Sequence, residues 1–324
     1  MSSLLIDLAA ASRMIRDAQR ILFFMHVQPD GDSIGSTLGM IRALRQMGKE
    51  AVMVGVDPIP PMYHFLPGWD SYRVEWQDVD GEWDLSCFLD CGDLERVGDA
   101  LPAVQRGRRT LNVDHHATNT AFAEFNYLDF SAAAVGELAY RILREIGAPI
   151  DPETALCLYT SLVTDTGGFR YDSTGPSTHR VAADLIELGA RPYDVAQAIF
   201  ETESLPRLAL LARALQTLRL DGGGRVAWMV ITREMLREAG AQEHDAEGVV
   251  NYARSVSGVE VGILFKETPD GRVRVSLRSR KTADVGAVAK GFGGGGHARA
   301  AGCTLYTGLD EAVGQVLAAV KAVL

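Results

Sequence analysis

The amino-acid sequence predicts an α/β protein with two domains, the first built on a parallel sheet and the second smaller. Short apolar runs alternate with helical periods through the first half of the chain, a pattern typical of a parallel sheet covered by helices on both faces. A helical stretch follows, and strand patterns then begin again. The length of 324 residues also favours two domains, because a domain usually has roughly 150 residues.

The elements of the first domain follow from local patterning. Runs of four to eight apolar residues predict buried strands, and apolar residues that recur with a helical period predict helices. The expected strands are 21–26, 51–56, 85–90 and 110–114, and the expected helices are 33–47, 132–146 and 152–163. We therefore expect a first domain that covers residues 1–190.

A helical linker is expected over residues 191–221, where a strongly periodic apolar segment ends at a run of glycines. The second domain is predicted to cover residues 222–324. Its expected elements are a strand at 225–231, a hairpin of strands 259–267 and 272–280, and a short helix at 284–290.

Composition and charge exclude several classes of protein. Hydrophobic residues make up 47% of the chain and charged residues 23%, as in ordinary globular proteins. The formal net charge of −10 makes long duplex DNA a poor partner, because affinity for it comes from neutralising many phosphates. The N-terminal segment lacks the pattern of a signal peptide and the apolar run at 21–25 is too short to span a bilayer. We expect a cytoplasmic protein with no membrane partner.

The four cysteines form no CxxC pair and no dense framework. We expect them to be reduced, buried and packed like small hydrophobic residues. Cys87 and Cys91 would supply half of a zinc site, but the sequence offers no second pair.

The loop after the first expected strand carries His26, Asp30 and Asp32. In an extended segment, residues two apart point to the same side, so the two carboxylates would repel each other unless a cation lay between them. Carboxylates suit Mg²⁺ or Mn²⁺, and an added imidazole favours Mn²⁺. The alternative is a solvated turn in which one carboxylate caps the next helix.

Two further expected strands also end in polar residues, Asp90 and the triplet Asp114-His115-His116. A carboxylate at the end of a buried strand is costly to desolvate unless it is paired or binds a metal. A salt bridge from Asp90 to Arg96 is the alternative. Adjacent residues of an extended chain point to opposite sides, so one histidine can bind a metal while the other faces a substrate, with Asp114 orienting an imidazole.

Asp165 ends an apolar helix and is followed by Thr166 and two glycines, which suggests a tight turn close to a bound group. An ordinary helix C-terminus is the alternative, although a carboxylate is unfavourable there. Because ligands of open α/β sheets bind outside the carboxyl ends of the strands, we expect these polar residues to converge on one rim.

The second domain offers positive charge beside a glycine run. Alternation along the strand 272–280 places Arg278 and Arg280 on one face, together with Arg272 and Arg274, for which a solvated face is an equally good interpretation. The run Gly293–His297 can present backbone N–H groups to an anion. A flexible turn is the alternative for the glycines.

Taken together, these motifs resemble those of the DHH phosphoesterases. HVQPDGDSIGS, LDCGD, DHH and TDTGGFR match the four motifs of that superfamily, and Arg278-Ser279-Arg280 with GGGGH is similar to the associated DHHA1 domain. The resemblance covers nearly the whole chain. It implies a Rossmann-like catalytic DHH domain and a smaller α/β DHHA1 domain that binds substrate.

The resemblance also implies residue roles and two divalent metal ions, for which Mn²⁺ is preferred and Mg²⁺ is the alternative. It implies that one ion is held by His26, Asp30 and Asp90 and the other by Asp32, Asp90, His115 and Asp165. His116, tuned by Asp114, would face the substrate as an acid or as a phosphate ligand. A hydroxide between two such ions is a strong nucleophile at neutral pH. The implied substrate-binding residues are Arg278, Arg280, Gly294, Gly295, Gly296 and His297.

Among the activities of this superfamily, the compact two-domain layout is similar to the NrnA-type enzymes. The resemblance implies hydrolysis of short RNA and linear dinucleotides to 5′-mononucleotides, or of 3′-phosphoadenosine 5′-phosphate to AMP. RecJ-type exonucleases carry further domains, and family II pyrophosphatases lack the GGGGH element. A cyclic-dinucleotide phosphodiesterase, a RecJ-like exonuclease and a non-catalytic nucleotide-binding protein stay open as alternatives, as does a homodimer.

Overall fold

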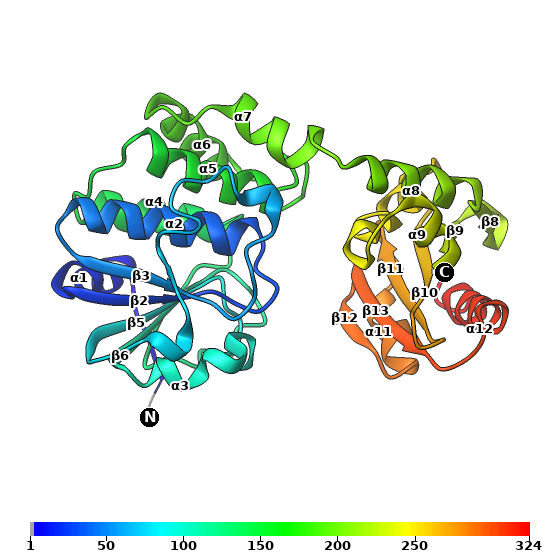
Figure 1. The fold of residues 1–324 in the computed structure, drawn as a ribbon, viewed down its shortest axis with the longest axis horizontal. Helices are drawn as coiled ribbons and strands as arrows, with labels where there is room; N and C mark the ends of the chain where they lie inside the picture. The colour runs from blue at the N-terminus through cyan, green and yellow to red at the C-terminus, as the bar shows by residue number, and fades with distance from the viewer. Residues whose placement is uncertain (1–2) are drawn as a thin grey trace. The chain divides into compact units, whose positions relative to one another are not determined.

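The computed structural model describes residues 3–324. The chain divides into two compact units, the first ending at Thr202 and the second beginning at Glu203 (Figure 1). The segment expected as a helical linker is shared between them. Helix α7 (Pro192–Ala196) and the π-helical turn η4 (Gln197–Glu201) belong to the first unit, and α8 (Leu205–Gln216) and β8 (Arg219–Asp221) to the second.

The first unit is built on a seven-stranded sheet in which every pair of neighbouring strands is parallel, in the order β1-β7-β6-β5-β2-β3-β4. The expected parallel sheet is therefore confirmed. Its strands are β1 (Leu4–Leu5), β2 (Arg20–Phe24), β3 (Glu50–Val54), β4 (Arg73–Val74), β5 (Trp83–Leu89), β6 (Gly107–Asp114) and β7 (Phe125–Leu128).

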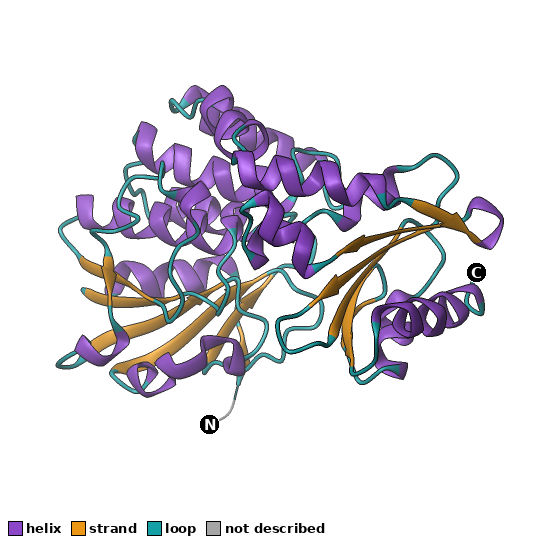
Figure 2. Ribbon diagram, turned by 45° about the vertical axis from the view of Figure 1, so that its right-hand side comes forward, coloured by secondary structure: helices purple, strands orange, loops and turns teal. Residues whose placement is uncertain are grey.

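Helices cover both faces of this sheet (Figure 2). The larger core packs alternate strand residues such as Phe23 and Cys87 against five long helices, and the smaller core packs Phe24 and Phe88 against α3 and the 3-10 segment η3. This double burial explains the continuous apolar runs. The helices of the unit are α1 (Leu8–Asp17), α2 (Gly31–Gln46), α3 (Leu101–Val104), α4 (Val135–Glu145), α5 (Pro152–Asp165) and α6 (Pro176–Glu187), with 3-10 helices η1 (Pro61–Tyr63), η2 (Trp76–Asp78) and η3 (Leu94–Ala100).

Helices α2 and α5 approach each other closely through small residues. A Cβ atom at Gly35 would lie 2.5 Å from the carbonyl oxygen of Cys157, a separation that no side chain tolerates. Asp30 caps α2 by accepting from the backbone N–H groups of Asp32 and Ser33. The capping interpretation of Asp30 is thus correct, and this contact fixes the helix that carries part of the site.

The second unit contains a six-stranded mixed sheet in the order β12-β13-β11-β10-β9-β8. The expected hairpin forms, with Val261 opposite Ser279 and Glu267 opposite Val273. Two layers of helices pack on opposite faces of this sheet. The remaining elements are η5 (Gly222–Gly224), β9 (Val226–Ile231), α9 (Arg233–Ala239), η6 (Glu243–Ala246), α10 (Val250–Ser255), β10 (Val261–Glu267), β11 (Val273–Ser279), α11 (Val285–Gly291), β12 (Gly295–His297), β13 (Ala300–Leu305) and α12 (Leu309–Lys321).

Other expectations about the whole chain can be compared directly with the structure. All four cysteines are buried free thiols, as the sequence predicts. Across residues 3–324, no helix combines the length and apolar character needed to cross a bilayer.

Candidate metal centre

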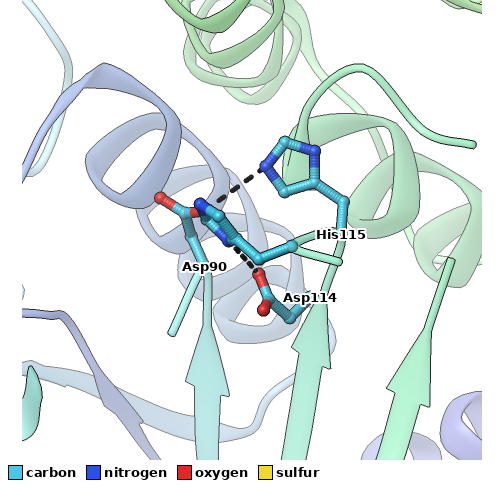
Figure 3. A group of neighbouring side chains, drawn as sticks. Asp90, Asp114 and His115 are labelled. Carbon is cyan, nitrogen blue, oxygen red and sulfur yellow. Dashed lines mark hydrogen bonds and ion pairs between the residues drawn. The ribbon is translucent and has the colours of Figure 1, made fainter. Parts of the chain in front are cut away.

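The carboxyl ends of three neighbouring strands bring the polar residues of the first unit together. His26 follows β2, Asp90 follows β5 and Asp114 is the last residue of β6, and these strands are adjacent in the sheet. Figure 3 shows Asp90 and Asp114 at the ends of two neighbouring strands, with His115 beside them. The convergence follows from the parallel order, which places all the strand ends on one edge.

One group of possible ligands consists of His26, Asp30 and Asp90, whose ligand atoms lie within 4.8 Å of one another. The His26 Nε2 atom lies 3.4 Å from an Asp90 carboxylate oxygen and 3.8 Å from one of Asp30. The His26 Nδ1 atom lies 2.8 Å from the backbone oxygen of Val27, and a hydrogen bond there leaves Nε2 free to bind a metal.

A second group consists of Asp32, His115 and Asp165, again with ligand atoms within 4.8 Å of one another. The His115 Nε2 atom lies 3.7 Å from Asp32, 3.6 Å from Asp165 and 3.7 Å from Asp90. Asp90 therefore stands between the two groups, with one oxygen facing His26 and the other facing His115.

The expectation that Asp30 and Asp32 extend to the same side of a loop is wrong. Helix α2 begins at Gly31, so Asp30 is the N-cap and Asp32 is helical. The two carboxylates consequently enter different groups of ligands. A helix rotates successive residues around its axis, whereas residues two apart share a side only in an extended segment.

The Asp32 carboxylate is held by three hydrogen-bond donors. Its oxygens accept hydrogen bonds from the backbone N–H groups of Val135, at 2.7 Å, and Gly136, at 3.2 Å. The hydroxyl of Ser161 donates to the same carboxylate. These contacts place the carboxylate at the N-terminus of α4, where a negative charge is favourable.

His116 shares a neighbour with His115, because both lie near Oδ1 of Asp90, and Asp114 completes a third group of possible ligands with these residues. The His116 Nδ1 atom lies 2.8 Å from Oδ1 of the fully buried Asp114 and 3.5 Å from Asp90. The two imidazole rings are nearly perpendicular, at 72°. The different roles expected for the two histidines stay a prediction, and the alternative pairing of Asp90 with Arg96 is absent among the ion pairs of residues 3–324. Arg96 instead has a guanidinium nitrogen 3.0 Å from His26 Nδ1.

The backbone at Asp90 adopts the left-handed conformation, with φ of 62°. Non-glycine residues rarely do so, although Asp is among those that tolerate it best. Strain of this kind persists where the surrounding structure holds it and tends to occur at functional sites. The turn after β5 thereby presents a buried carboxylate, 2% exposed, to both ligand groups.

Burial and mutual repulsion keep protons on the carboxylates when no cation is bound. Burial, together with the Asp165 charge, raises the pKa of Asp32 to about 7. Burial and the Asp32 charge likewise raise the pKa of Asp90 to about 7, and burial raises the pKa of Asp165 to about 6. A bound cation would lower these pKa values, because a nearby positive charge favours the ionised carboxylates.

The histidines have pKa values shifted upward by the same carboxylates. Burial lowers the pKa of His26, but the neighbouring carboxylates of Asp30 and Asp90 outweigh burial and raise the value to about 10. The hydrogen bond to Asp114 raises the pKa of His116 to about 9. Burial lowers the pKa of His115, but the neighbouring carboxylates outweigh burial and raise it.

The residues fit a metal centre by their chemistry. The Nε2 atom of His26 and Oδ1 of Asp90 are buried and have no hydrogen-bond partner within residues 3–324, and such orphaned polar atoms are costly without a ligand. Oxygen and imidazole nitrogen donors suit divalent cations. The cluster could therefore hold metal.

The predicted substrate residues lie in the second unit. A groove of about 710 Å³ on the sheet is lined by Arg278 and by the glycines Gly294, Gly295 and Gly296. His297 is exposed at the end of β12 and Arg280 donates to the backbone oxygen of Arg254 at 2.9 Å; neither lines that groove. The glycine run is partly ordered as strand β12, which pairs with β13.

Sequence reasoning missed two residues that support the site, Ser161 and Asn119. Ser161 has no local signal, because it reaches Asp32 from a helix 129 positions along the chain. Asn119 donates to Asp114 and to the backbone oxygen of Cys91. Its position five residues after Asp114, in a polar loop, could have indicated that it supports this carboxylate.

Comparison with known proteins agrees with this geometry. Residues 20–162 match the model of the DHH family N-terminal domain and residues 223–324 match the DHHA1 domain. The chain is 35% identical over 298 residues to the "Bifunctional oligoribonuclease and PAP phosphatase NrnA" of Thermus thermophilus, covering 91% of this chain and 87% of that one. It is 28% identical to the Bacillus subtilis protein of the same name, covering 90% and 91%.

A solved structure has the same fold over its whole length. The crystal structure of an exopolyphosphatase-related protein from Bacteroides fragilis superposes with a TM-score of 0.90 at 27% identity, covering 97% of this chain and 96% of that one. The ordered strand-end ligands, the two matched domains and these relatives lead to one conclusion. The chain belongs to the DHH family, carries a DHHA1 domain, and is a phosphoesterase that hydrolyses phosphoester bonds.

Proposed function

We propose that this protein hydrolyses short oligoribonucleotides and linear dinucleotides to 5′-mononucleotides, and 3′-phosphoadenosine 5′-phosphate to AMP, with two Mn²⁺ ions. The observation that carries the proposal is the position of Asp90 between the two ligand groups, within 3.7 Å of both His26 and His115. One carboxylate shared by two sets of donors suits a pair of cations. The names of the relatives from Thermus thermophilus and Bacillus subtilis support the two kinds of substrate.

The proposed ligands are His26, Asp30 and Asp90 for one ion and Asp32, Asp90, His115 and Asp165 for the other. The four carboxylates carry a charge equal and opposite to that of two divalent cations, so a phosphate substrate meets no excess negative charge. When bound, such a pair activates water at neutral pH and neutralises charge on the phosphoryl oxygens. Mg²⁺ is the alternative, and the imidazole donors favour Mn²⁺ over it.

The proposed roles of His116 and Asp114 follow from their hydrogen bond. Asp114 accepts from Nδ1 of His116 at 2.8 Å, which fixes the ring and leaves Nε2 to reach a substrate oxygen. In the metal-free protein the hydrogen bond to Asp114 raises the pKa of His116 to about 9. A protonated Nε2 can either hold a phosphoryl oxygen or donate a proton to the leaving oxygen.

In the second unit, Arg278 and the backbone of Gly294, Gly295 and Gly296 are proposed to bind a substrate phosphate. Arginine suits phosphate because its planar fork donates two parallel hydrogen bonds. The proposal extends to Arg280 and His297, although both lie outside the lining of the groove. A small set of positive groups reconciles a nucleotide substrate with the net charge of −10.

A turnover panel tests this proposal. The purified full chain is incubated with 5′-phosphorylated dinucleotides, a pentaribonucleotide, cyclic dinucleotides and 3′-phosphoadenosine 5′-phosphate, with Mn²⁺ and Mg²⁺ compared. We expect hydrolysis of the linear substrates and of the 3′-phosphonucleotide, faster with Mn²⁺. Intact linear substrates and intact 3′-phosphonucleotide in the presence of Mn²⁺ would overturn it.

A pair of variants separates the metal centre from general damage. Asp90→Asn removes the shared ligand and is expected to reduce kcat by a factor of at least about 10³, a larger loss than the change of a single supporting residue gives. Asp70→Asn changes an exposed carboxylate of the same unit and is expected to retain wild-type turnover. Equal activity of Asp90→Asn and wild type would contradict the proposed ligand set.

A further inference from the structure

The groove on the second unit extends well beyond the phosphate-binding residues proposed above. Antiparallel pairing places Arg278 opposite Ala300, Ser276 opposite Gly302 and Arg274 opposite Thr304 on one face of strands β11 and β13. This register makes a floor of small side chains along the middle of the groove. The remaining lining includes Phe292, Arg272 and Tyr306.

The groove is open because helices cover the groove face of the sheet over β9 and β10 but not over β11 and β13. Helices α8, α9 and α10 pack on residues of β9 and β10, such as Met229 and Leu264. On the opposite face, α11 and α12 cover the alternate residues of β11 and β13, such as Val275 and Cys303. The groove residues whose side chains alternate with these on β11 and β13 belong to neither buried core; they are Arg274, Ser276, Arg278, Ala300, Gly302 and Thr304.

Arg272 and Tyr306 form an aromatic and cationic platform at the end of the groove remote from Arg278. The guanidinium carbon of Arg272 lies 5.5 Å from the centroid of the Tyr306 ring, a cation–π distance. Asp270 pairs with the same guanidinium, which restrains it. The Tyr306 side chain is nevertheless 79% exposed, so a large part of this aromatic residue is open to solvent.

Arg274 stands between this platform and Arg278. It is exposed, and within residues 3–324 its side chain makes no hydrogen bond and no ion pair. Residues two apart on one strand are separated by about 6.8 Å, and the six positions from Arg272 to Arg278 span about 20 Å. A single nucleotide held at Arg278 would leave the platform empty, whereas an extended oligonucleotide would reach it.

We propose that Arg274 and the Arg272–Tyr306 platform form a subsite for a second nucleotide of a single-stranded oligoribonucleotide. Tyr306 would stack on a base, and Arg274 would hold the phosphate that joins this nucleotide to the one bound at Arg278. Exposed aromatic rings beside arginines bind single strands in this way with little dependence on sequence. The subsite rests on the proposed function and adds to it a reason to prefer oligonucleotides over 3′-phosphonucleotides.

The experiment compares two substrates on the metal-loaded full chain. kcat/KM is measured for a 5′-phosphorylated pentaadenylate and for 3′-phosphoadenosine 5′-phosphate, in wild type, Tyr306→Ala, Tyr306→Phe and Arg274→Ala. We expect Tyr306→Ala to reduce the ratio of the first value to the second about 5- to 100-fold, the loss that removal of one base–aromatic stack produces. Tyr306→Phe keeps an aromatic ring and should keep most of this ratio. Arg274→Ala should reduce it and weaken its dependence on salt.

A second measurement is independent of turnover. Binding of a 3′-fluorescein-labelled, 5′-phosphorylated pentaadenylate to the full-length Asp90→Asn variant is followed by fluorescence anisotropy, with and without Tyr306→Ala. Tyr252→Ala removes another exposed tyrosine of the same unit, on α10, and serves as the matched control.

The two proposals can fail separately. If wild type hydrolyses neither substrate, the proposed function fails, and weaker pentaadenylate binding by Tyr306→Ala still supports the subsite. If Tyr306→Ala leaves both the kcat/KM ratio and the binding unchanged, or if Tyr252→Ala has the same effect, the subsite is overturned. An equal loss on both substrates would also overturn it, because the platform would then not discriminate between them.

Discussion

The side-chain amide of Asn119 donates to Oδ2 of the buried Asp114 at 2.5 Å, while Oδ1 of the same carboxylate lies 2.8 Å from Nδ1 of His116. Asn119 also donates to the backbone oxygen of Cys91 at 3.1 Å and accepts from the backbone N–H of Ala121 at 2.7 Å. One amide thus joins the loop after β6 to the turn after β5, and it holds the carboxylate that orients His116.

Replacing Asn119 with Ala is expected to reduce kcat about 10- to 100-fold, the usual effect of losing a residue that orients a group at a metal site. KM should change less, because His116 is misplaced rather than removed. Steady-state kinetics with Mn²⁺ checks this, and circular dichroism verifies the fold. Asn251→Ala, at an exposed position of α10, is the control. Wild-type kcat in Asn119→Ala would contradict the role of this hydrogen bond.

The stability of the metal-free protein is expected to fall as pH rises. The pKa values of Asp32 and Asp90 are raised to about 7 in the folded state, above about 3.9 for an unfolded Asp. The folded state therefore binds more protons between these values, and stability is lost as pH increases through that window. His26, with a pKa raised to about 10, continues the loss from about pH 6.5 to about pH 10.

Thermal unfolding in EDTA from about pH 5 to about pH 9 measures this effect. Added Mn²⁺ should raise Tm more at the higher pH, because the ligands must be deprotonated to bind it. Asp90→Asn removes one titrating group and should flatten the pH dependence in EDTA. A Tm in EDTA that increases with pH, or a Mn²⁺ effect that shrinks, would contradict the buried cluster.

Gly35 is expected to be intolerant of any side chain. Its Cβ would lie 2.5 Å from the backbone oxygen of Cys157, so Gly35→Ala must separate α2 from α5, at a cost of about 1–3 kcal/mol. Gly314→Ala is the matched control, because Gly314 lies within α12 with no atom within 4 Å of the added Cβ. That change should be neutral or stabilise by up to about 1 kcal/mol. Urea unfolding of both variants checks the contrast, and equal effects would rule out the close helix contact.

Glu260 is expected to stabilise the second unit through three hydrogen bonds. Its Oε1 accepts from the backbone N–H groups of Lys281 at 2.9 Å, Thr282 at 2.5 Å and Ala283 at 3.0 Å. Burial raises the pKa of Glu260, but these hydrogen bonds outweigh burial and lower the value to about 2. This contribution is therefore present above about pH 4.3, the unfolded value, and is lost as pH falls toward 2.

The Glu260→Gln variant should lower Tm at neutral pH, and the difference from wild type should vanish in acid. Glu247→Gln, at an exposed residue, provides the control in thermal unfolding. A Tm difference that stays constant down to about pH 2.5 would show that the charge of Glu260 is irrelevant.

Local residue patterns predict the four neighbouring strands β6, β5, β2 and β3 of the first unit and the polar residues at the ends of three of them. Parallel strands buried on both faces must be apolar, so polar residues such as Asp90 and Asp114 can follow only where a strand leaves the core. Short strands with a less apolar or less β-branched composition were not predicted. Phe125–Leu128 contains the buried Asn126, which interrupts the apolar pattern, and Ala300–Leu305 begins with small residues of low strand preference.

The grouping of the strand-end residues depends on contacts between distant segments of the chain. The start of α2 at Gly31 sends Asp30 toward His26 and Asp32 toward His115, and no spacing rule for an extended loop anticipates that. Ser161 reaches Asp32 from 129 positions away, and Tyr306 meets Arg272 because each lies one residue beyond the antiparallel pair of Val273 and Leu305. Residue type and local period determine which side chains can act, whereas contacts between distant segments determine which of them act together.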